Sequence, residues 1–600
     1  MPHFVARRVS LAILSIPLAV SLARGQTRYT IAVDPADTMT IRVEMAVANV
    51  HDSVRVAMAT HDEYDDKYWR YVRDIAAENA GAAMSVSRVD SQTWSVRSVN
   101  GDVVIRYYIA LPPLAAGRTR QGWKPFVSAN GALLGGIDNL MYVDGRANES
   151  STLTVRVPKG WRLATGLEAT DDPHAFRARD AAVLLDSPVL TGPIREWKAG
   201  ATRIAFLPSP RTVPFDTAAL ADVVTRITGK AIGIFGAPPF KDYVFLLVDG
   251  AGLTLEHWNS LVLGVNSAEL AKDPAYYATE LAHEFFHTWN LIRLHPRGLR
   301  QFRAAPTPQV SELWWSEGMT IYFADEILLR AGLYPAGQTR ATRFATRIGR
   351  YLTNPGYTHI SPQRASMTSG SPPGVNGDYS GDYYLTGQLI GDLLELTIRD
   401  STKGARGMDQ VIAALYRTRA GEPGYTLDDI QHVADSICGC KLDQIFTDHV
   451  RDSKPIDFAP ALATIGYRMD VTFEMAKDPS GNPIPDTRAY VARANDADST
   501  SPLLIGITRP AGAWGAAGLH SGDQLLTIDG RRIASWDEFR ALLRTAKVGQ
   551  TLTVAYSRDG VRHEAKVLMD VYVVPHVTLA DLPNATPAQL ARRAKWLAAQ

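Results

Sequence analysis

The sequence predicts a multidomain α+β protein, because the character of the chain changes twice along its 600 residues. The first third alternates apolar and polar positions, as strands do. Helical patterns begin near residue 216, and a turn-forming stretch at 477–483 precedes a final mixed region. We therefore expect a β-rich domain (26–207), a mostly helical domain (208–455), a connecting segment (456–479), a small mixed domain (480–575) and a C-terminal tail helix (576–600).

The first 25 residues have the pattern of a signal peptide. A pair of arginines precedes an apolar stretch from residue 9 to 23, and small residues stand three places and one place before Gln26. The stretch is short for a membrane span and contains Pro17. We expect export to the periplasm or the extracellular space after removal of residues 1–25, with no membrane span in the mature chain. An uncleaved anchor is the alternative.

Charge and cysteine content give little indication of a partner. Lys and Arg number 63 and Asp and Glu 62, so the near-neutral balance gives no case for nucleic-acid binding. The two cysteines stand in Cys438-Gly439-Cys440, a spacing that is tight for a disulfide. We interpret them as incidental, with a strained redox pair as the alternative.

Residues 281–290, LAHEFFHTWN, contain the pattern HExxH. On a helix, His283 and His287 share one face and can reach one cation. Zinc suits nitrogen ligands and keeps a position for water in catalytic sites, where Glu284 can take a proton from that water. The composition gives about 0.03 matches by chance, so a chance match on a buried helix is the weaker reading.

The flanking residues predict a helix from Ala275 to Leu294. Asp273 and Pro274 read as an N-cap followed by proline at the first helical position. Pro296 and Gly298 close the segment. An apolar stripe can bury this helix: Leu281, Phe285, Trp289 and Ile292.

A third ligand is expected on a second helix, from near Ser311 to near Gly332. Glu312 lies in its first turn, where a negative charge complements the helix dipole. Glu326 lies near its end, where we expect solvation. Glu317 stands among apolar residues, where an acid needs a partner. It is therefore the candidate ligand, with a buried ion pair to an arginine as the alternative.

The HEFFHTWN segment followed by Trp314-Trp315-Ser316-Glu317-Gly318 resembles the glycyl-aminopeptidase-type metallopeptidases. These gluzincins are relatives of the aminopeptidase N superfamily, with HExxH and a later WxxEG that supplies the third zinc ligand. The intervening residues, 288–316, are more numerous than in the aminopeptidase N branch and fit the glycyl branch. The resemblance implies a thermolysin-like catalytic domain and a Zn²⁺ ion held by His283, His287 and Glu317.

Two further segments carry the resemblance. Residues 253–257 align with a GGLEH-like segment, which implies that Glu256, next to His257, binds the substrate α-amino group. Leu253 and Thr254 replace the two glycines of the family, and an ordinary strand-end acid is the alternative. Residues 381–389 resemble a YxxG segment whose tyrosine stabilises the oxyanion. Tyr384 fills that position, with the adjacent Tyr383 as its rival and a tyrosine capping a core as the alternative.

Residues 513–530 contain AGLxxGDxLLxIDG and resemble a PDZ domain. Ile505-Gly506-Ile507 is the expected carboxylate-binding loop, in which Gly506 receives the C-terminus of a peptide that is added as a strand. A PDZ fold used only as a packing module is the alternative.

We thus expect an exported zinc aminopeptidase that acts on peptides. Glu284 would activate water and Tyr384 would stabilise the oxyanion. A preference for N-terminal Gly or Ala rests on the resemblance. A zinc endopeptidase and a non-catalytic PDZ peptide-binding protein with a peptidase-like scaffold remain alternatives, and the oligomeric state stays open.

Overall fold

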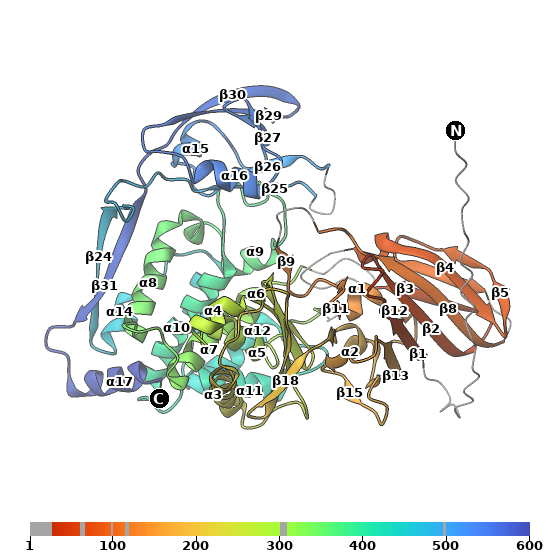
Figure 1. The fold of residues 1–600 in the computed structure, drawn as a ribbon. Helices are drawn as coiled ribbons and strands as arrows, with labels where there is room; N and C mark the ends of the chain where they lie inside the picture. Colours follow the sequence, from red (N-terminus) through yellow and green to blue (C-terminus); the bar gives the residue numbers. More distant parts are fainter. Residues whose placement is uncertain are drawn as a thin grey trace.

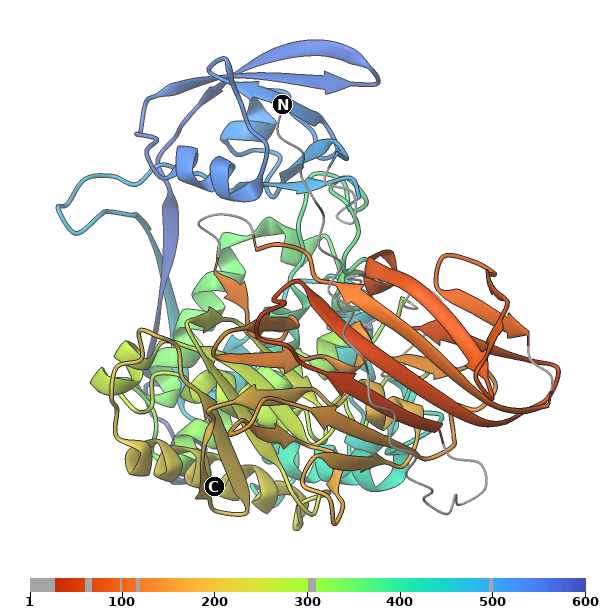
Figure 2. The ribbon, with the colours of Figure 1, turned by 45° about the vertical axis from the view of Figure 1, so that its right-hand side comes forward.

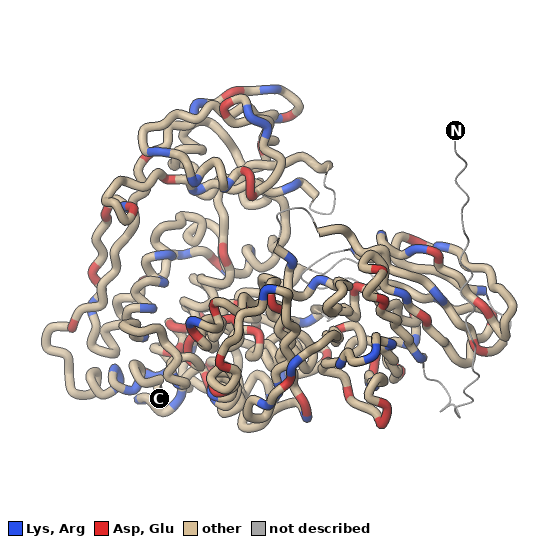
Figure 3. The backbone as a smooth tube through the Cα atoms, viewed as in Figure 1, with Lys and Arg blue, Asp and Glu red and all other residues tan. Residues whose placement is uncertain are grey.

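A computed structural model describes residues 27–59, 67–97, 100–114, 119–299, 309–495 and 500–599. The expected signal peptide lies outside these ranges. Among the helices that they contain, none has the length and apolar character needed to cross a bilayer. Lys and Arg residues and Asp and Glu residues are interspersed along the backbone (Figure 3).

The N-terminal part is a β-rich domain, as the alternating sequence pattern predicts (Figure 1). Its largest sheet has eight strands in the order β15-β16-β13-β1-β2-β8-β4-β5. In β1, inward-facing residues are buried at every second position. The strands of this sheet are β1 (Thr27–Ala32), β2 (Thr40–Val50), β4 (Val72–Asn79), β5 (Ala82–Met84), β8 (Gly101–Ala110), β13 (Ser151–Arg156), β15 (Glu168–Ala169) and β16 (Ala175–Ala178).

Two four-stranded sheets complete this domain, in the orders β12-β3-β7-β6 and β10-β11-β17-β14. The first consists of β12 (Met141–Val143), β3 (Ser53–Met58), β7 (Thr93–Arg97) and β6 (Val86–Arg88). The second consists of β10 (Phe126–Ser128), β11 (Gly131–Leu134), β17 (Val189–Gly192) and β14 (Arg162–Thr165). The short helix α2 (Ala181–Leu185) packs beside them.

The middle region is built on a five-stranded sheet in the order β18-β19-β20-β23-β22. Its strands are β18 (Arg195–Ala199), β19 (Thr202–Leu207), β20 (Val244–Asp249), β23 (Ser260–Val265) and β22 (Thr254–His257). The boundary expected at residue 207 divides this sheet, because β18 and β19 precede that residue and β19 pairs in parallel with β20. An alternating strand pattern does not indicate which sheet a strand joins.

Helices surround this sheet on the side that carries the HExxH segment (Figures 1 and 2). Several of these helices share one hydrophobic core with the strands. The helices of the region are α3 (Thr217–Phe235), α4 (Ser267–Lys272), α5 (Ala278–Phe286), α6 (Leu313–Ser316), α7 (Gly318–Ala331), α8 (Arg340–Thr353), α9 (Pro362–Met367), α10 (Tyr383–Ser401), α11 (Met408–Arg419), α12 (Leu427–Cys438) and α13 (Asp443–Phe446).

A two-stranded ribbon connects the helical region to the small C-terminal domain. Strand β24 (Tyr467–Met475) pairs antiparallel with β31 (Val573–Asp581), and the ribbon packs on α8 along one side of the molecule (Figure 1). The last helix, α17 (Pro587–Leu597), then returns to the helical region, where Trp596 is fully buried. The small domain is therefore an insertion between two strands, and the segments before and after it both pack on the helical region.

The inserted domain has a sheet in the order β25-β26-β27-β29-β30 and two helices. Its elements are β25 (Ala489–Arg493), β26 (Leu503–Ile507), α15 (Ala513–Ala516), β27 (Gln524–Ile528), β28 (Arg531–Arg532), which pairs with β27, α16 (Trp536–Leu543), β29 (Thr551–Arg558) and β30 (Val561–Leu568).

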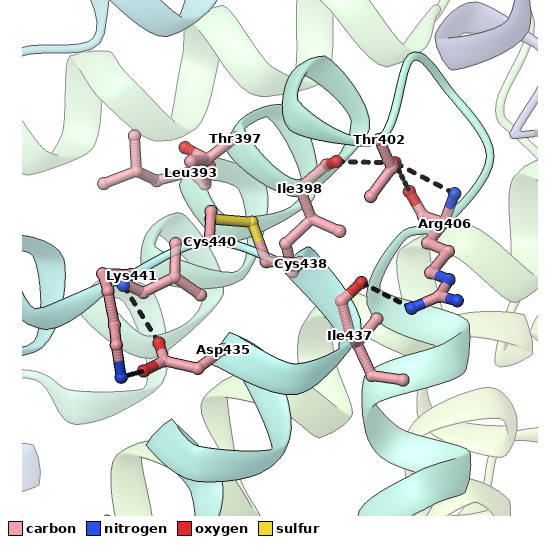
Figure 4. The surroundings of a disulfide bond; sticks show 11 residues. Leu393, Thr397, Ile398, Thr402, Arg406, Asp435, Ile437, Cys438, Cys440 and Lys441 are labelled. Carbon is pink, nitrogen blue, oxygen red and sulfur yellow. Dashed lines mark hydrogen bonds and ion pairs between the residues drawn. A yellow bond between two sulfur atoms is a disulfide. The ribbon is translucent and has the colours of Figure 1, made fainter.

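Cys438 and Cys440 form a disulfide, so our interpretation of these residues as incidental was wrong. Figure 4 shows the bond across the end of α12, beside α10. The intervening Gly439 ends α12 with φ of 63°, and this left-handed turn brings the two Cα atoms to 5.0 Å. Sequence spacing alone does not reveal such a turn.

Candidate functional site

The donor atoms of three side chains meet between α5 and the junction of α6 and α7. The Nε2 atoms of His283 and His287 lie 3.0 Å apart, and each lies 3.4 Å from Oε2 of Glu317. Ligand atoms about 2.0–2.1 Å from a tetrahedral zinc ion lie about 3.3 Å from one another. The three donors have nearly these separations without any rearrangement, and therefore fit a zinc ion.

The electrostatics of the cluster agree with this fit. Burial lowers the pKa of His283. Burial also disfavours a proton on His287, but the Glu317 carboxylate outweighs it and raises the pKa of His287 to about 10. Burial favours protonated Glu317, but the two imidazoles outweigh it and hold the pKa of that carboxyl well below its usual range. An anionic carboxylate between two imidazoles is an arrangement that a divalent cation stabilises.

The ring of His287 is oriented by the residues that follow it. Its Nδ1 lies 2.8 Å from the carbonyl oxygen of Asn290, so Nδ1 donates and Nε2 stays free for the cation. The Asn290 side chain donates to the carbonyl oxygens of Trp315 and Ser316 at 3.2 and 3.0 Å. Asn290 thereby ties the HExxH segment to the segment that carries Glu317, a role that its sequence position did not indicate.

The helices around the ligands differ from the expected ones in length. The first spans only Ala278–Phe286, because Asp273 ends the preceding α4 instead of starting this helix. After His287 the chain turns, and Asn290 bridges to Leu294. The expected second helix is interrupted at Glu317, which joins α6 to α7. Its expected end at Gly332 agrees with a left-handed cap there.

Two glycines bring α10 against the third ligand. A side chain on Gly387 would lie 2.1 Å from the carbonyl oxygen of Trp314, and one on Gly318 would lie 2.5 Å from the Cα of Gly387. Only hydrogen at both positions permits this approach. The last residue of WxxEG and the last residue of YxxG are therefore in contact, which explains why both motifs end in glycine.

This contact places the first turn of α10, with Tyr383 and Tyr384, beside the Glu317 segment. The two rings stack with centroids 4.8 Å apart. The hydroxyl of Tyr383 lies 3.2 Å from Oγ of Ser369, so it is directed into the preceding loop. This contact shows where the hydroxyl of Tyr383 lies, which the motif alone does not indicate.

Glu284 lies among the metal-binding groups. A carboxylate oxygen of Glu284 and ring nitrogens of His283 and His287 all lie within 4.8 Å of one another. A cavity of about 200 Å³ opens beside these residues. Apolar side chains of α7 form part of its wall, and Glu280 and Gln388 contribute polar groups. The acid thus faces both the cation site and a space for a substrate.

Glu256 lies on β22, the edge strand of the sheet, and is buried. Its charge helps to raise the pKa of His287, so it acts on the metal cluster through space. His257, by contrast, directs Nδ1 to Oδ1 of Asp186 in the β-rich domain at 2.9 Å. This pair joins the two domains, a role that the resemblance did not indicate.

The other glutamates of the second helix have different roles. Glu312 accepts hydrogen bonds from Oγ of Ser311 and from the amide of Leu427. It therefore links the start of α6 to the start of α12. Glu326 is buried against Arg340 at 2.6 Å, so the expectation of a solvated residue there was wrong. Its partner Arg340 comes from α8, so the sequence of α7 does not reveal the pair.

Gly506 lies inside β26, opposite Tyr490 on β25, and not in a loop. The expectation of a carboxylate-binding loop at 505–507 was therefore wrong. A side chain on Gly506 would lie 2.1 Å from the Tyr490 ring, so glycine is required there for packing. The apolar Ile-Gly-Ile pattern suits a buried strand as well as a loop, which is why the sequence did not separate the two.

Comparison with known proteins gives three family matches. The model described as the peptidase M61 N-terminal domain matches residues 28–193, and the one described as M61 glycyl aminopeptidase matches residues 277–390. A PDZ domain model matches residues 471–569. The second of these ranges contains the three candidate metal ligands together with Glu284 and Tyr384.

The chain is also similar to a solved structure in its fold and, over short stretches, to two curated proteins. The fold resembles the crystal structure of an aminopeptidase N family protein from Idiomarina loihiensis, with a TM-score of 0.74 at 19% identity, covering 95% of this chain and 100% of that one. A protein of Haemophilus influenzae named a probable periplasmic serine protease of the Do/HhoA-like type is 29% identical over 82 residues, 14% of this chain. One of Neisseria meningitidis, named as a candidate zinc metalloprotease, is 41% identical over 63 residues, 10% of this chain. The chain spans only 18% and 14% of the lengths of these two curated relatives.

Proposed function

Because the chain carries the N-terminal and catalytic domains of the M61 peptidases and belongs to that family, we propose that it is a zinc-dependent aminopeptidase acting on peptides. The observation that carries the proposal is the convergence of His283, His287 and Glu317 at ligand distances, with Glu284 beside them. A scaffold that only binds peptides has no need for this convergence.

The proposed mechanism assigns one task to each residue. Zinc supplies Lewis acidity at the cluster. The Glu284 carboxylate accepts a proton from the attacking water and returns it to the nitrogen of the leaving amine. The phenol of Tyr384 donates a hydrogen bond to the substrate carbonyl oxygen as negative charge develops there. His287 keeps its orientation through Asn290, so its Nε2 stays directed at the cluster.

The test of hydrolysis is Glu284→Gln. The amide keeps the shape of the side chain but cannot take a proton, so hydrolysis of aminoacyl-p-nitroanilides should fall by roughly 10²–10⁴-fold. Zinc measured by atomic emission should stay near one ion per chain. Full activity in this variant would contradict the proposed mechanism. A purified chain that does not take up zinc would favour the non-catalytic alternative.

The aminopeptidase assignment depends on Glu256. Its buried carboxylate near His287 is suited to an ammonium group, and loss of one partner from such a desolvated pair costs about 2–5 kcal/mol. Glu256→Ala should therefore slow cleavage of free-amine substrates far more than cleavage of Nα-acetylated ones. If the wild type cleaves blocked and free substrates at equal rates, the enzyme is an endopeptidase. The preference for Gly or Ala is proposed from the family match alone.

We propose that the protein is exported from the cytoplasm. The signal-peptide pattern at residues 1–25 and the Cys438–Cys440 disulfide support it, since disulfides persist in oxidising compartments. The name of the Haemophilus influenzae relative, which contains the word periplasmic, agrees. Cell fractionation of the full chain and of one lacking residues 1–25 tests this: both variants remaining in the cytoplasm would contradict it.

We propose that the PDZ domain takes an extended peptide along β25, the edge strand of its sheet. The amides just before this strand already have acceptors: Arg488 N donates to Oδ1 of Asp486 at 3.1 Å, and Ala489 N donates to the carbonyl oxygen of Thr487 at 2.8 Å. This favours an internal segment over the free C-terminus that the sequence led us to expect. Peptides ending in a carboxylate and in an amide should bind equally in fluorescence anisotropy, and a clear preference for the carboxylate would contradict this mode.

A further inference from the structure

The loop between α9 and α10 makes polar contacts with the PDZ domain. We call residues 368–382 the α10 loop. Its Asp378 accepts two hydrogen bonds from one turn of the PDZ domain, from Nδ1 of His520 at 2.7 Å and from the amide of Ser521 at 2.6 Å. The backbones also meet, because a side chain on Gly374 would lie 3.0 Å from the carbonyl oxygen of Ser521. The contact is therefore built from both domains.

A second contact comes from Tyr490 of β25. Its ring lies over Gly506, and together with the α10 loop and Tyr383 it lines a cavity of about 230 Å³. Tyr383 in turn is held to the loop through Ser369 and stacks on Tyr384. The PDZ sheet thus presents an aromatic ring to the segment that leads into the candidate catalytic tyrosine.

The end of the α10 loop caps the helix. Oδ1 of Asp382 accepts from the amides of Tyr384 and Leu385 at 2.9 and 3.4 Å. The position of Asp382 therefore fixes where the first turn of α10 begins. A shift of the loop would move this cap and, with it, the phenol of Tyr384.

The PDZ domain is itself anchored, so it can hold the loop. The ribbon of β24 and β31 packs on α8, and the guanidinium of Arg488 donates to the carbonyl oxygen of Thr353 at the end of that helix. These anchors attach the PDZ domain to the helical region independently of the hydrogen bonds that His520 and Ser521 make to Asp378. The domain is thereby held on α8 while its turn contacts the loop.

We propose that the PDZ domain acts within its own chain as a positioning element for Tyr384, with Asp378 as the positioning residue. This inference rests on the proposed catalytic role of Tyr384. It gives the domain a function besides peptide binding: without the contact, the α10 loop has more freedom and the phenol spends less time where the oxyanion forms. Substrate binding through Glu256 and the zinc ligands does not depend on the contact.

The first test is Asp378→Ala in the full chain. A misplaced catalytic group slows the chemical step but leaves substrate binding unchanged. We therefore expect kcat to fall about tenfold while KM changes little. Zinc content should not change, and hydrogen exchange of peptides covering residues 369–382 should become faster. Asp378→Asn keeps an acceptor for the Ser521 amide and should recover part of the loss. Glu564→Ala, which removes an exposed carboxylate on β30, is the matched control and should behave as wild type.

The second test combines this change with Tyr384→Phe. If Asp378 acts through Tyr384, then Asp378→Ala should cause no further loss of kcat in the Tyr384→Phe background. Independent, multiplicative losses would overturn the inference, as would unchanged kcat and unchanged exchange in Asp378→Ala. If the wild type shows no zinc-dependent hydrolysis, the proposed function fails. The role of the contact is then tested by hydrogen exchange alone: unchanged exchange of the α10 loop in Asp378→Ala would overturn it.

Discussion

At the scale of single residues, Leu253 explains a departure from the family pattern. It stands where the GGLEH-like segment has glycine, its φ is 66°, and 61% of its surface is exposed. A left-handed conformation costs a side-chain-bearing residue about 1–2 kcal/mol, whereas glycine adopts it freely. The backbone at this position therefore favours glycine, and Leu253 adopts the same conformation at a cost in conformational energy.

Leu253→Gly should thus stabilise the protein. The relief of strain exceeds the greater entropy of the unfolded glycine, so the free energy of unfolding should rise by up to about 1 kcal/mol. Thermal unfolding monitored by circular dichroism measures the effect. Leu253→Ala, which keeps the strain and also removes the exposed side chain, should give no gain, and an equal gain in both variants would contradict the argument from φ.

At the scale of elements, a buried ion pair joins α7, α8 and α17. Arg340 has no exposed side-chain surface and meets Glu326 at 2.6 Å, while its Nη1 donates to the carbonyl oxygen of Trp596 at 2.7 Å. Burial raises the pKa of Glu326 to about 7, against the opposing effects of Arg340 and Arg330. The Glu326 carboxylate therefore needs the neighbouring Arg340 and Arg330 to remain ionised.

Arg340→Met should cost about 3–5 kcal/mol of stability, because it leaves a buried carboxylate without its nearest cation. Urea unfolding monitored by tryptophan fluorescence measures this. Arg340→Met combined with Glu326→Leu removes both charges and should recover most of the loss. A double variant as unstable as the single one would show that Arg340 acts through packing on Trp596 instead.

At the scale of the whole molecule, the ribbon makes the PDZ domain an insertion. Met475 and Val573 face each other at the end of the ribbon, so residues 476–572 can be replaced by Asn-Gly, the preferred two-residue hairpin turn. The shortened chain keeps α17 and its buried Trp596, and should fold and bind one zinc ion per chain. Its kcat should fall about as far as in Asp378→Ala, since both lose the same contact.

The matched control is a chain that ends at residue 582 and so keeps the PDZ domain but lacks α17. Loss of a fully buried tryptophan from a core costs about 3–5 kcal/mol, so this chain should unfold at a clearly lower temperature than wild type. Differential scanning fluorimetry compares the two. If the hairpin variant were the less stable one, the inserted PDZ domain would contribute more to the stability of the catalytic region than α17 does.

The sequence alone determined the domain order, the family and the identity of the metal, because these depend on local patterns. HExxH places two imidazoles on one helical face whatever surrounds the helix, and WxxEG and the PDZ motif are equally local. The structure brings together His283, His287 and Glu317 as the motifs imply.

The tertiary structure decided what no local pattern contains. Glu326 is buried beside Arg340 of α8, and residues 195–207 join the helical region because β19 pairs with β20. The ribbon, the Asp378 contact and the burial of Trp596 join segments more than a hundred residues apart in the chain or at its far end. Periodicity reports the face that an element buries but not its partner, so these long-range pairings follow only from the assembled fold.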